Sequence, residues 1–186
     1  MTDLDAQQEL AFIKKVMTDS RKILIDDGKG TIFWGLLISF GLLITYLSVA
    51  QGWESTLSWF WPALIGFGWI YTIVTEIRRE RKRRVKTFAG KIMGAVWIAF
   101  GISATILGFV GTVMGAYHGV IISPLIAVLL GTGYLVCGVL YGKSWVSYLS
   151  IGWWGGAIVM FYMQNLETLL IMIGMLILLQ IITGII

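Results

Sequence analysis

Charged residues are scarce in this chain. Only 13% of its 186 residues are Asp, Glu, Lys or Arg, whereas 58% are hydrophobic. A soluble domain is about one quarter charged, because polar side chains must cover the surface that faces water. The chain has too few charges for such a surface. This excludes a soluble globular protein and makes lipid the expected outer solvent.

Residues that commonly carry chemistry are equally few. There is one cysteine, Cys137, and one histidine, His118. A single thiol excludes an internal disulfide and a cysteine-based metal site. A histidine without a nearby Cys, Asp or second His is not a metal site either. Because no nucleophile, base and carboxylate can be assembled, we expect no enzymatic activity, no metal and no cofactor.

Long apolar runs are what the chain has instead. A helix needs about 20 mostly apolar residues to cross roughly 30 Å of hydrocarbon. The runs are continuously apolar, without the alternation of a membrane barrel, and a helix satisfies its own backbone hydrogen bonds in lipid. The expected fold is an all-α, polytopic membrane protein, with residues 30–186 forming a bundle of six transmembrane helices. The spans are expected at about residues 31–50, 57–76, 91–114, 120–141, 145–162 and 168–186.

The basic residues predict the orientation of these spans. All fourteen Lys and Arg residues fall on one side of a six-span arrangement. Basic loops stay in the cytoplasm, so we expect the N-terminus, the C-terminus and the basic loop there, in the inner membrane of a bacterium. The first thirty residues lack the apolar core of a cleavable signal peptide, so the first span is expected to remain as an anchor.

A weak internal repeat recurs at an offset of sixty residues. It matches Gly30, Ile32, Ile38, Phe40, Gly41, Thr45 and Leu47 with Gly90, Ile92, Ile98, Phe100, Gly101, Thr105 and Leu107. The unit would be a helical hairpin, used three times in parallel orientation; chance similarity between Gly-rich helices is the alternative. Three hairpins with tight loops resemble the general plan of the small six-span membrane proteins of bacterial acid resistance. The resemblance extends to that plan and to no motif.

Residues 1–29 are expected to form a cytoplasmic segment with an amphipathic helix over residues 3–25. Apolar residues spaced four and three apart make one stripe, with its centre at Leu10, Ile13 and Met17 and its end near Leu24. Three placements fit this stripe. It lies in the membrane interface, packs on the chain's own basic loop, or pairs with a partner as a short coiled coil.

A dense basic loop separates the second and third spans. Its expected contact residues are Arg78, Arg79, Arg81, Lys82, Arg83, Arg84 and Lys86. Nucleic acid is an unsuitable partner, because the charges adjoin a membrane and no reading domain is present. Anionic lipid headgroups suit the cluster better, at about 1 kcal/mol per residue. An acidic protein partner or a second copy of the chain remains the alternative.

Several polar or aromatic residues lie deep within the predicted spans. Trp69, Trp97, Trp153, Trp154 and Gln180 are the residues expected at a pocket, if one exists. A deep indole must place its N–H on a partner, so packing between helices competes with the pocket interpretation. Glycines in GxxxG pairs favour close packing of helices. Glu76 is expected to form an ion pair with a neighbouring arginine.

Two functional classes follow. The first is an interaction protein, such as an accessory, scaffold or regulatory subunit, with the amphipathic helix and basic loop as its working surface. The second is a small channel or transporter for neutral or apolar solutes. The missing polar pathway in the sequence favours the first class. A continuous polar or aromatic-lined cavity would favour the second.

Overall fold

The protein is helical wherever the structure describes it. The computed structural model describes residues 28–53, 57–82 and 88–185, and no strand occurs within them. The expected N-terminal helix with Leu10, Ile13, Met17 and Leu24 lies outside these residues. So do Arg83, Arg84 and Lys86 of the basic loop.

Six of the helical segments are long and apolar enough to cross a membrane, as the sequence predicts. The first two are α2 (Lys29–Ala50) and α3 (Leu57–Lys82). The third consists of α4 (Phe88–Thr105), the π-helical η2 (Ile106–Val110) and α5 (Gly111–Val113). The fourth joins a 3-10 turn, η3 (Gly119–Ile121), to α6 (Ile122–Tyr141), and the fifth is α7 (Ser144–Met163). The sixth runs through α8 (Thr168–Met175), a second π-helical segment η4 (Leu176–Ile181) and α9 (Ile182–Ile185).

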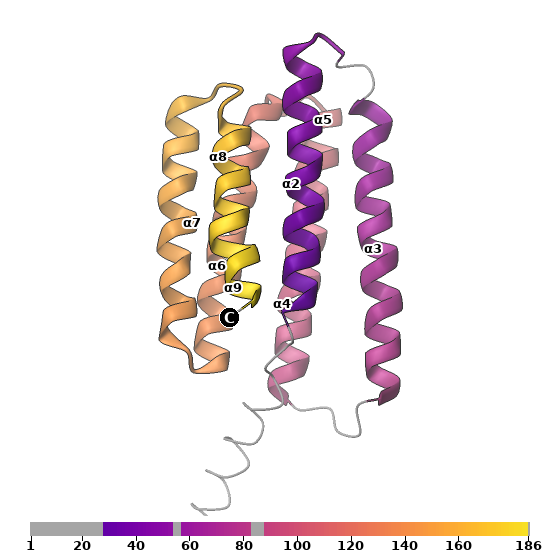
Figure 1. Cartoon of the computed structure of the whole chain (residues 1–186), viewed down its shortest axis with the longest axis vertical. Coiled ribbons are helices and arrows are strands. Elements are labelled where there is room, and N and C mark those ends of the chain that lie inside the picture. The colour runs from indigo at the N-terminus through magenta and orange to yellow at the C-terminus, as the bar shows by residue number, and fades with distance from the viewer. Residues whose placement is uncertain (1–27, 54–56, 83–87, 186) are drawn as a thin grey trace, which may run out of the picture.

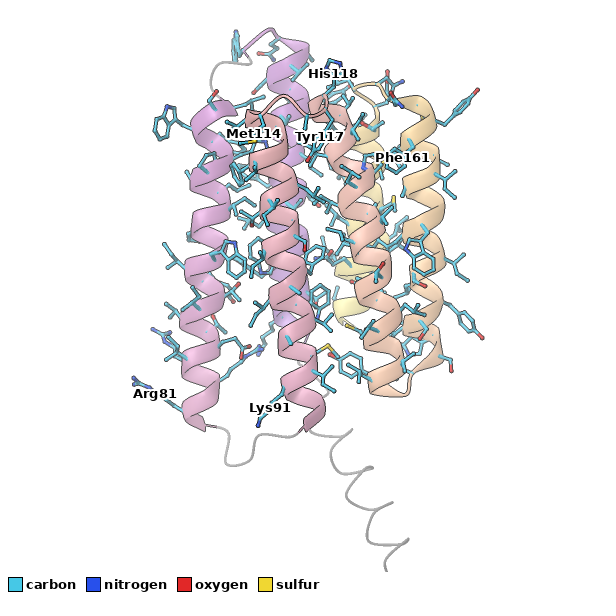
Figure 2. All side chains as sticks on the ribbon, turned by 180° about the vertical axis from the view of Figure 1, so that it is seen from behind. Arg81, Lys91, Met114, Tyr117, His118 and Phe161 are labelled. Atoms are coloured by element: carbon cyan, nitrogen blue, oxygen red, sulfur yellow. The ribbon has the colours of Figure 1, made fainter. Side chains whose placement is uncertain are left out.

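These six segments run alternately up and down side by side (Figure 1). One end of the bundle carries Arg81 and Lys91, and we call it the basic end. The other carries Tyr117 and His118, and we call it the turn end (Figure 2). Many apolar side chains point outward, including Ile70 at 64% exposure and Ile158 at 70%. An apolar outer surface on helices of this length is consistent with a multi-pass membrane protein.

The core is concentrated in one part of the bundle. Its most deeply buried side chains come from α6, α7 and the α8–η4 helix, among them Ala127, Trp153, Met160 and Met172. The most extensive contact between helices joins α6 to α7, whereas α3 packs chiefly on α2. The α3 and α4 helices therefore stand further from the core than their neighbours do.

The close approach of α6 and α7 depends on Gly138. A β-carbon added at this position would lie 2.8 Å from Ser147 Cα, so one of the two backbones would have to move. A β-carbon at Gly133, another buried glycine of α6, would meet nothing within 4 Å.

Gly138→Ala should therefore destabilise the bundle, whereas Gly133→Ala should not. Overpacking of a tight interface costs roughly 1–3 kcal/mol, so we expect Gly138→Ala to lower the melting temperature of the detergent-solubilised protein by several degrees. Gly133→Ala makes the same chemical change in the same helix and serves as the control. Equal melting temperatures for the two variants would contradict the packing that we describe.

Candidate functional site

A long, only partly enclosed cavity lies between the outer helices and the core. Its volume is about 1870 Å³, and α2, α3, α4, α6 and the α8–η4 helix all contribute to its walls. It reaches from Glu76 and Lys91 near the basic end to Ser58 and His118 near the turn end. The cavity thus extends along the whole length of the bundle. It exists because α3 and α4 pack less closely on the core than the other helices do.

The cavity walls are mainly apolar and aromatic. The aromatic lining residues are Trp34, Trp61, Trp69, Tyr71, Trp97, Phe100, Phe109, Tyr134, Tyr141 and Trp145. Acidic and basic lining residues occur only toward the ends of the bundle. They are Glu76, Arg79, Lys91 and Lys143 at the basic end and His118 at the turn end. Between these ends, polar contacts come from uncharged threonines, serines and Gln180.

The residues expected at a pocket divide into two groups. Trp69, Trp97 and Gln180 line the cavity, whereas Trp153 and Trp154 are not among its lining residues. Trp153 is completely buried in the core, with its ring 5.9 Å from that of Tyr134. Trp154 packs against Gly131 of α6 and donates its indole N–H to the Val128 carbonyl at 3.3 Å.

At the basic end, the structure describes part of the predicted cluster. Glu76 accepts a hydrogen bond from Arg79 at 3.5 Å, one helical turn along α3. Arg78, Arg81 and Lys91 are exposed. An ion pair this exposed contributes little to stability. Its main effect is to place one negative and one positive charge at the mouth of the cavity.

Two tryptophans connect α2 and α3 through the same arrangement of three residues. Trp61 of α3 lies over Gly41 of α2 and donates its indole N–H to Thr45 Oγ1 at 3.0 Å. The Thr45 hydroxyl in turn donates to the Gly41 carbonyl at 2.8 Å. The glycine makes room for the ring, and the threonine four residues later accepts the indole N–H.

The same arrangement occurs in the opposite direction. Trp34 of α2 lies over Gly68 of α3 and donates to Thr72 Oγ1 at 3.0 Å, while Thr72 donates to the Gly68 carbonyl at 2.9 Å. We call each set a Trp–Gly–Thr unit. Two such units hold α2 against α3 with all their N–H and O–H groups satisfied.

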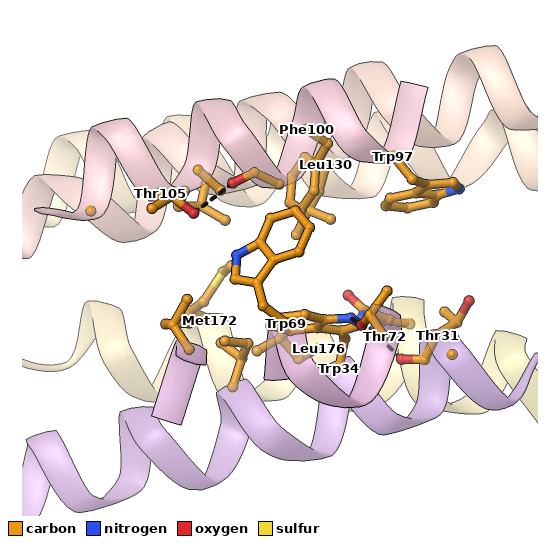
Figure 3. Close-up of a pocket in the computed structure, with 18 of the residues that line it drawn as sticks. Thr31, Trp34, Trp69, Thr72, Trp97, Phe100, Thr105, Leu130, Met172 and Leu176 are labelled. Atoms are coloured by element: carbon orange, nitrogen blue, oxygen red, sulfur yellow. Dashed lines mark hydrogen bonds between the residues drawn. The ribbon is translucent and has the colours of Figure 1, made fainter. Parts of the chain in front are cut away.

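A third unit is incomplete and lies inside the cavity. Trp69 extends from α3 to Gly101 of α4, where an added β-carbon would lie 2.7 Å from its ring. Thr105 donates to the Gly101 carbonyl at 2.7 Å. The Trp69 indole N–H, however, makes no hydrogen bond with any residue that the structure describes. Figure 3 shows the Trp69 ring crossing the cavity toward Phe100 and Leu130, between the half of the cavity that holds Trp97 and the half that holds Thr105.

Gly41 and Thr45 of the first unit match Gly101 and Thr105 of the third in the sixty-residue repeat. The sequence alone reveals this match, but it did not lead us to predict the Trp–Gly–Thr units to which these residues belong. The signal that could have revealed them is a Gly followed four residues later by a Thr, present on three successive spans and accompanied by tryptophans on their neighbours.

Comparison with known proteins yields no relative. No family model matches the sequence, and no curated protein or solved structure is significantly similar to it. Within residues 28–53, 57–82 and 88–185, no three His, Cys, Asp or Glu side chains come together as a metal-binding group. The cavity is therefore the feature of the molecule that points most directly to a function.

The hydrogen bonds of the Trp–Gly–Thr units lead to a prediction about stability. Thr45→Val or Thr72→Val leaves a tryptophan N–H without its acceptor, so each should lower the free energy of unfolding by roughly 1 kcal/mol. Thr105→Val removes the same hydroxyl and the same bond to a glycine carbonyl, but no indole N–H depends on it. Titration with SDS, followed by circular dichroism, should rank Thr105→Val as the least destabilised. If all three variants unfold alike, the indole bonds contribute nothing measurable.

Proposed function

We propose that this protein is a small membrane carrier or channel for neutral or apolar solutes. The observation that supports this function is the aromatic-lined cavity, which continues from one end of the bundle to the other. The sequence favours an interaction protein, because it reveals no pathway. The cavity supplies the feature that reverses that preference.

The size and lining of the cavity suit such solutes. Small-molecule pockets commonly measure about 300–1,000 Å³ and have mostly apolar walls with a few polar groups. This cavity is larger, at about 1870 Å³, so it has room for a solute together with a path on either side. An ion would be costly to move through its uncharged middle, whereas an apolar or aromatic molecule would not be.

Trp69 is the residue that we propose as the constriction on this path. Its ring crosses the cavity between α3 and Gly101, and no hydrogen bond to the described part of the chain holds its indole N–H. Trp34 and Trp61, in contrast, are both hydrogen-bonded to threonines. A ring that lacks such a bond can change its rotamer at lower cost, which would open a passage between the two halves.

We also propose the membrane arrangement in which this cavity works. Three successive hairpins are proposed, because α2 contacts α3, α4 contacts α6 and α7 contacts α8; the more extensive contacts of α6 with α7 and of α2 with the last helix would then join one hairpin to another. The basic end is proposed to face the cytoplasm of a bacterium, with both termini. Anionic lipid headgroups are proposed as the partners of Arg78, Arg79, Arg81 and the remaining loop cations.

An interaction protein is the second candidate. The exposed cations Arg78, Arg81 and Lys91 at one end of the bundle favour it, because they offer a surface to an acidic partner or to a second copy. In that case the N-terminal residues Leu10, Ile13 and Met17 would complete the working surface. Loss of an assembly partner from variants at those positions, with solute binding lost by none of them, would support this candidate.

Blocking the cavity should abolish solute binding. Gly94 lines the cavity and Gly155 does not, and a β-carbon at either position would meet nothing within 4 Å. We expect Gly94→Trp to weaken binding of the neutral probe N-phenyl-1-naphthylamine by at least tenfold, because the new indole occupies the site. Gly155→Trp adds the same ring on α7 outside the cavity and should bind like the wild type.

Fluorescence titration in lipid nanodiscs measures this binding, with protein-free nanodiscs subtracted. Binding of the wild type no greater than that of empty discs would refute the proposal. So would equal binding by the two tryptophan variants.

The orientation can be tested by labelling single cysteines. In a Cys137→Ser background, cysteines at Gln51, Tyr117 or Gln164 should react with an impermeant maleimide added to intact cells. A cysteine at Arg81 should react only after the cells are permeabilised, because the basic end is proposed to face inward. Labelling of Arg81→Cys in intact cells would overturn this orientation.

A further inference from the structure

The most unusual polar group in the cavity is the side-chain amide of Gln180. This residue lies in the π-helical segment η4, and it is only 7% exposed. Its Nε2 donates to the Thr31 carbonyl of α2 at 3.0 Å. Its Oε1, although buried, has no hydrogen-bond partner among the described residues. Short π-helical segments frequently occur at functional sites.

The single hydrogen bond determines which way this amide points. If the oxygen and nitrogen were exchanged, Oε1 would face the Thr31 carbonyl and two acceptors would meet. The observed orientation therefore leaves the amide oxygen as the available acceptor. Burying such an oxygen without a donor is costly in apolar surroundings. Gln180 lines the cavity, but its Oε1 has almost no accessible surface. A molecule inside the cavity can therefore supply the missing donor once the amide or a neighbouring side chain shifts toward it.

A second polar group lies in the same wall. Tyr134 is 5% exposed and also lines the cavity. Its hydroxyl makes no hydrogen bond of good geometry within the described part of the chain, although Thr183, one turn beyond Gln180, is its polar neighbour. The Tyr134 ring contacts Trp97 edge-on at 6.3 Å. A hydroxyl donor and an amide acceptor thus line one uncharged stretch of the cavity.

Aromatic side chains provide the rest of this stretch. Trp34 of α2 lies against the Trp69 ring, with 6.4 Å between the ring centroids, and Trp97 of α4 projects from the opposite wall (Figure 3). Flat apolar rings on both sides favour a flat aromatic molecule between them. The acidic and basic lining residues nearest this stretch lie toward its mouth at the basic end, so a charged ligand would lose its hydration without gaining a counter-ion.

We infer that this stretch binds a neutral aromatic molecule with one O–H or N–H donor. The donor bonds to Gln180 Oε1, the ring lies between Trp34 and Trp97, and the Tyr134 hydroxyl donates to the heteroatom of the ligand. The inference rests on the proposed function, because it names the class of solute that the cavity selects. An otherwise similar molecule without the donor leaves the Gln180 oxygen unpaired and binds more weakly.

Two probes that differ by one methyl group, which replaces the donor hydrogen, test the inference. Both 1-naphthol and 1-methoxynaphthalene are neutral at pH 7 and share the same ring and the same oxygen, but only 1-naphthol has an O–H. Equilibrium dialysis against the wild-type protein in nanodiscs, with empty nanodiscs subtracted, should show about fivefold to tenfold tighter binding of 1-naphthol. Equal affinities in the wild type would overturn the inference while leaving the proposed function intact. Absence of binding by both probes would also overturn the inference, and the proposed function would fall with it if N-phenyl-1-naphthylamine does not bind either.

Two variants show which residues cause the preference. Gln180→Met keeps the length of the side chain but removes the acceptor, so the ratio of the two affinities should fall to about one. Tyr134→Phe removes a donor that both probes can use, so it should weaken both probes and leave the ratio unchanged. A ratio that persists in Gln180→Met would overturn the inference. If Gln180→Met does not fold, the wild-type ratio and Tyr134→Phe decide: a wild-type ratio near one, or a Tyr134→Phe variant that binds both probes undiminished, would overturn it.

Discussion

The absence of water from a bilayer is the constraint on which the rest of this structure depends. An N–H or O–H group within the hydrocarbon is costly to leave without a partner in the chain, in a lipid headgroup or in a bound molecule. The backbone meets this requirement by forming helices. The tryptophans Trp34 and Trp61 meet it through threonines on the neighbouring helix, where a glycine makes room for each indole ring. Hydrogen bonding and close packing are therefore satisfied by the same residues, and α3 is attached to α2 without any buried charge.

This attachment produces a bundle with unequal halves. On one side, α6 and α7 approach so closely at Gly138 and Ser147 that no β-carbon fits between them. On the other side, α3 reaches α4 through the ring of Trp69, and the space around that ring is the cavity. Helices in lipid gain no hydrophobic free energy from meeting one another. An open region between them persists where large aromatic rings, in place of small residues, set the separation of the helices.

The spans could be predicted from the sequence because their signal is local. Length and lack of charge identify a membrane helix without any knowledge of its neighbours, and the observed helices agree with the expected ranges to within a few residues, apart from α3, which runs beyond the expected span into the basic loop. The depth of a residue in the membrane also follows from its position along its own span, which is why Trp69 and Trp97 could be predicted. The rotation of each helix about its own axis depends on its neighbours and cannot be read from one span. Trp153 and Trp154 lie as deep as the cavity residues, but their helix turns them toward the core and toward Gly131. The Trp–Gly–Thr units were missed for the same reason, since each joins residues on two different helices.

The π-helical segment η4 also gives the last helix a particular sensitivity to chain length. Successive residues of an α-helix are about 100° apart around its axis, and a π turn holds more residues than an α turn does. The direction in which Gln180 and Thr183 point therefore depends on the number of residues in Leu176–Ile181 as well as on their identity. Removing a single residue there would restore a regular α-helix. The side chains that follow the deletion would then rotate about the helix axis, away from Thr31 and Tyr134. The orientation of the last helix therefore depends on the length of η4. A substitution at an outward-facing position of η4 would change one side chain, but deletion of one residue would rotate the rest of the helix, so that a different face of it meets the bundle.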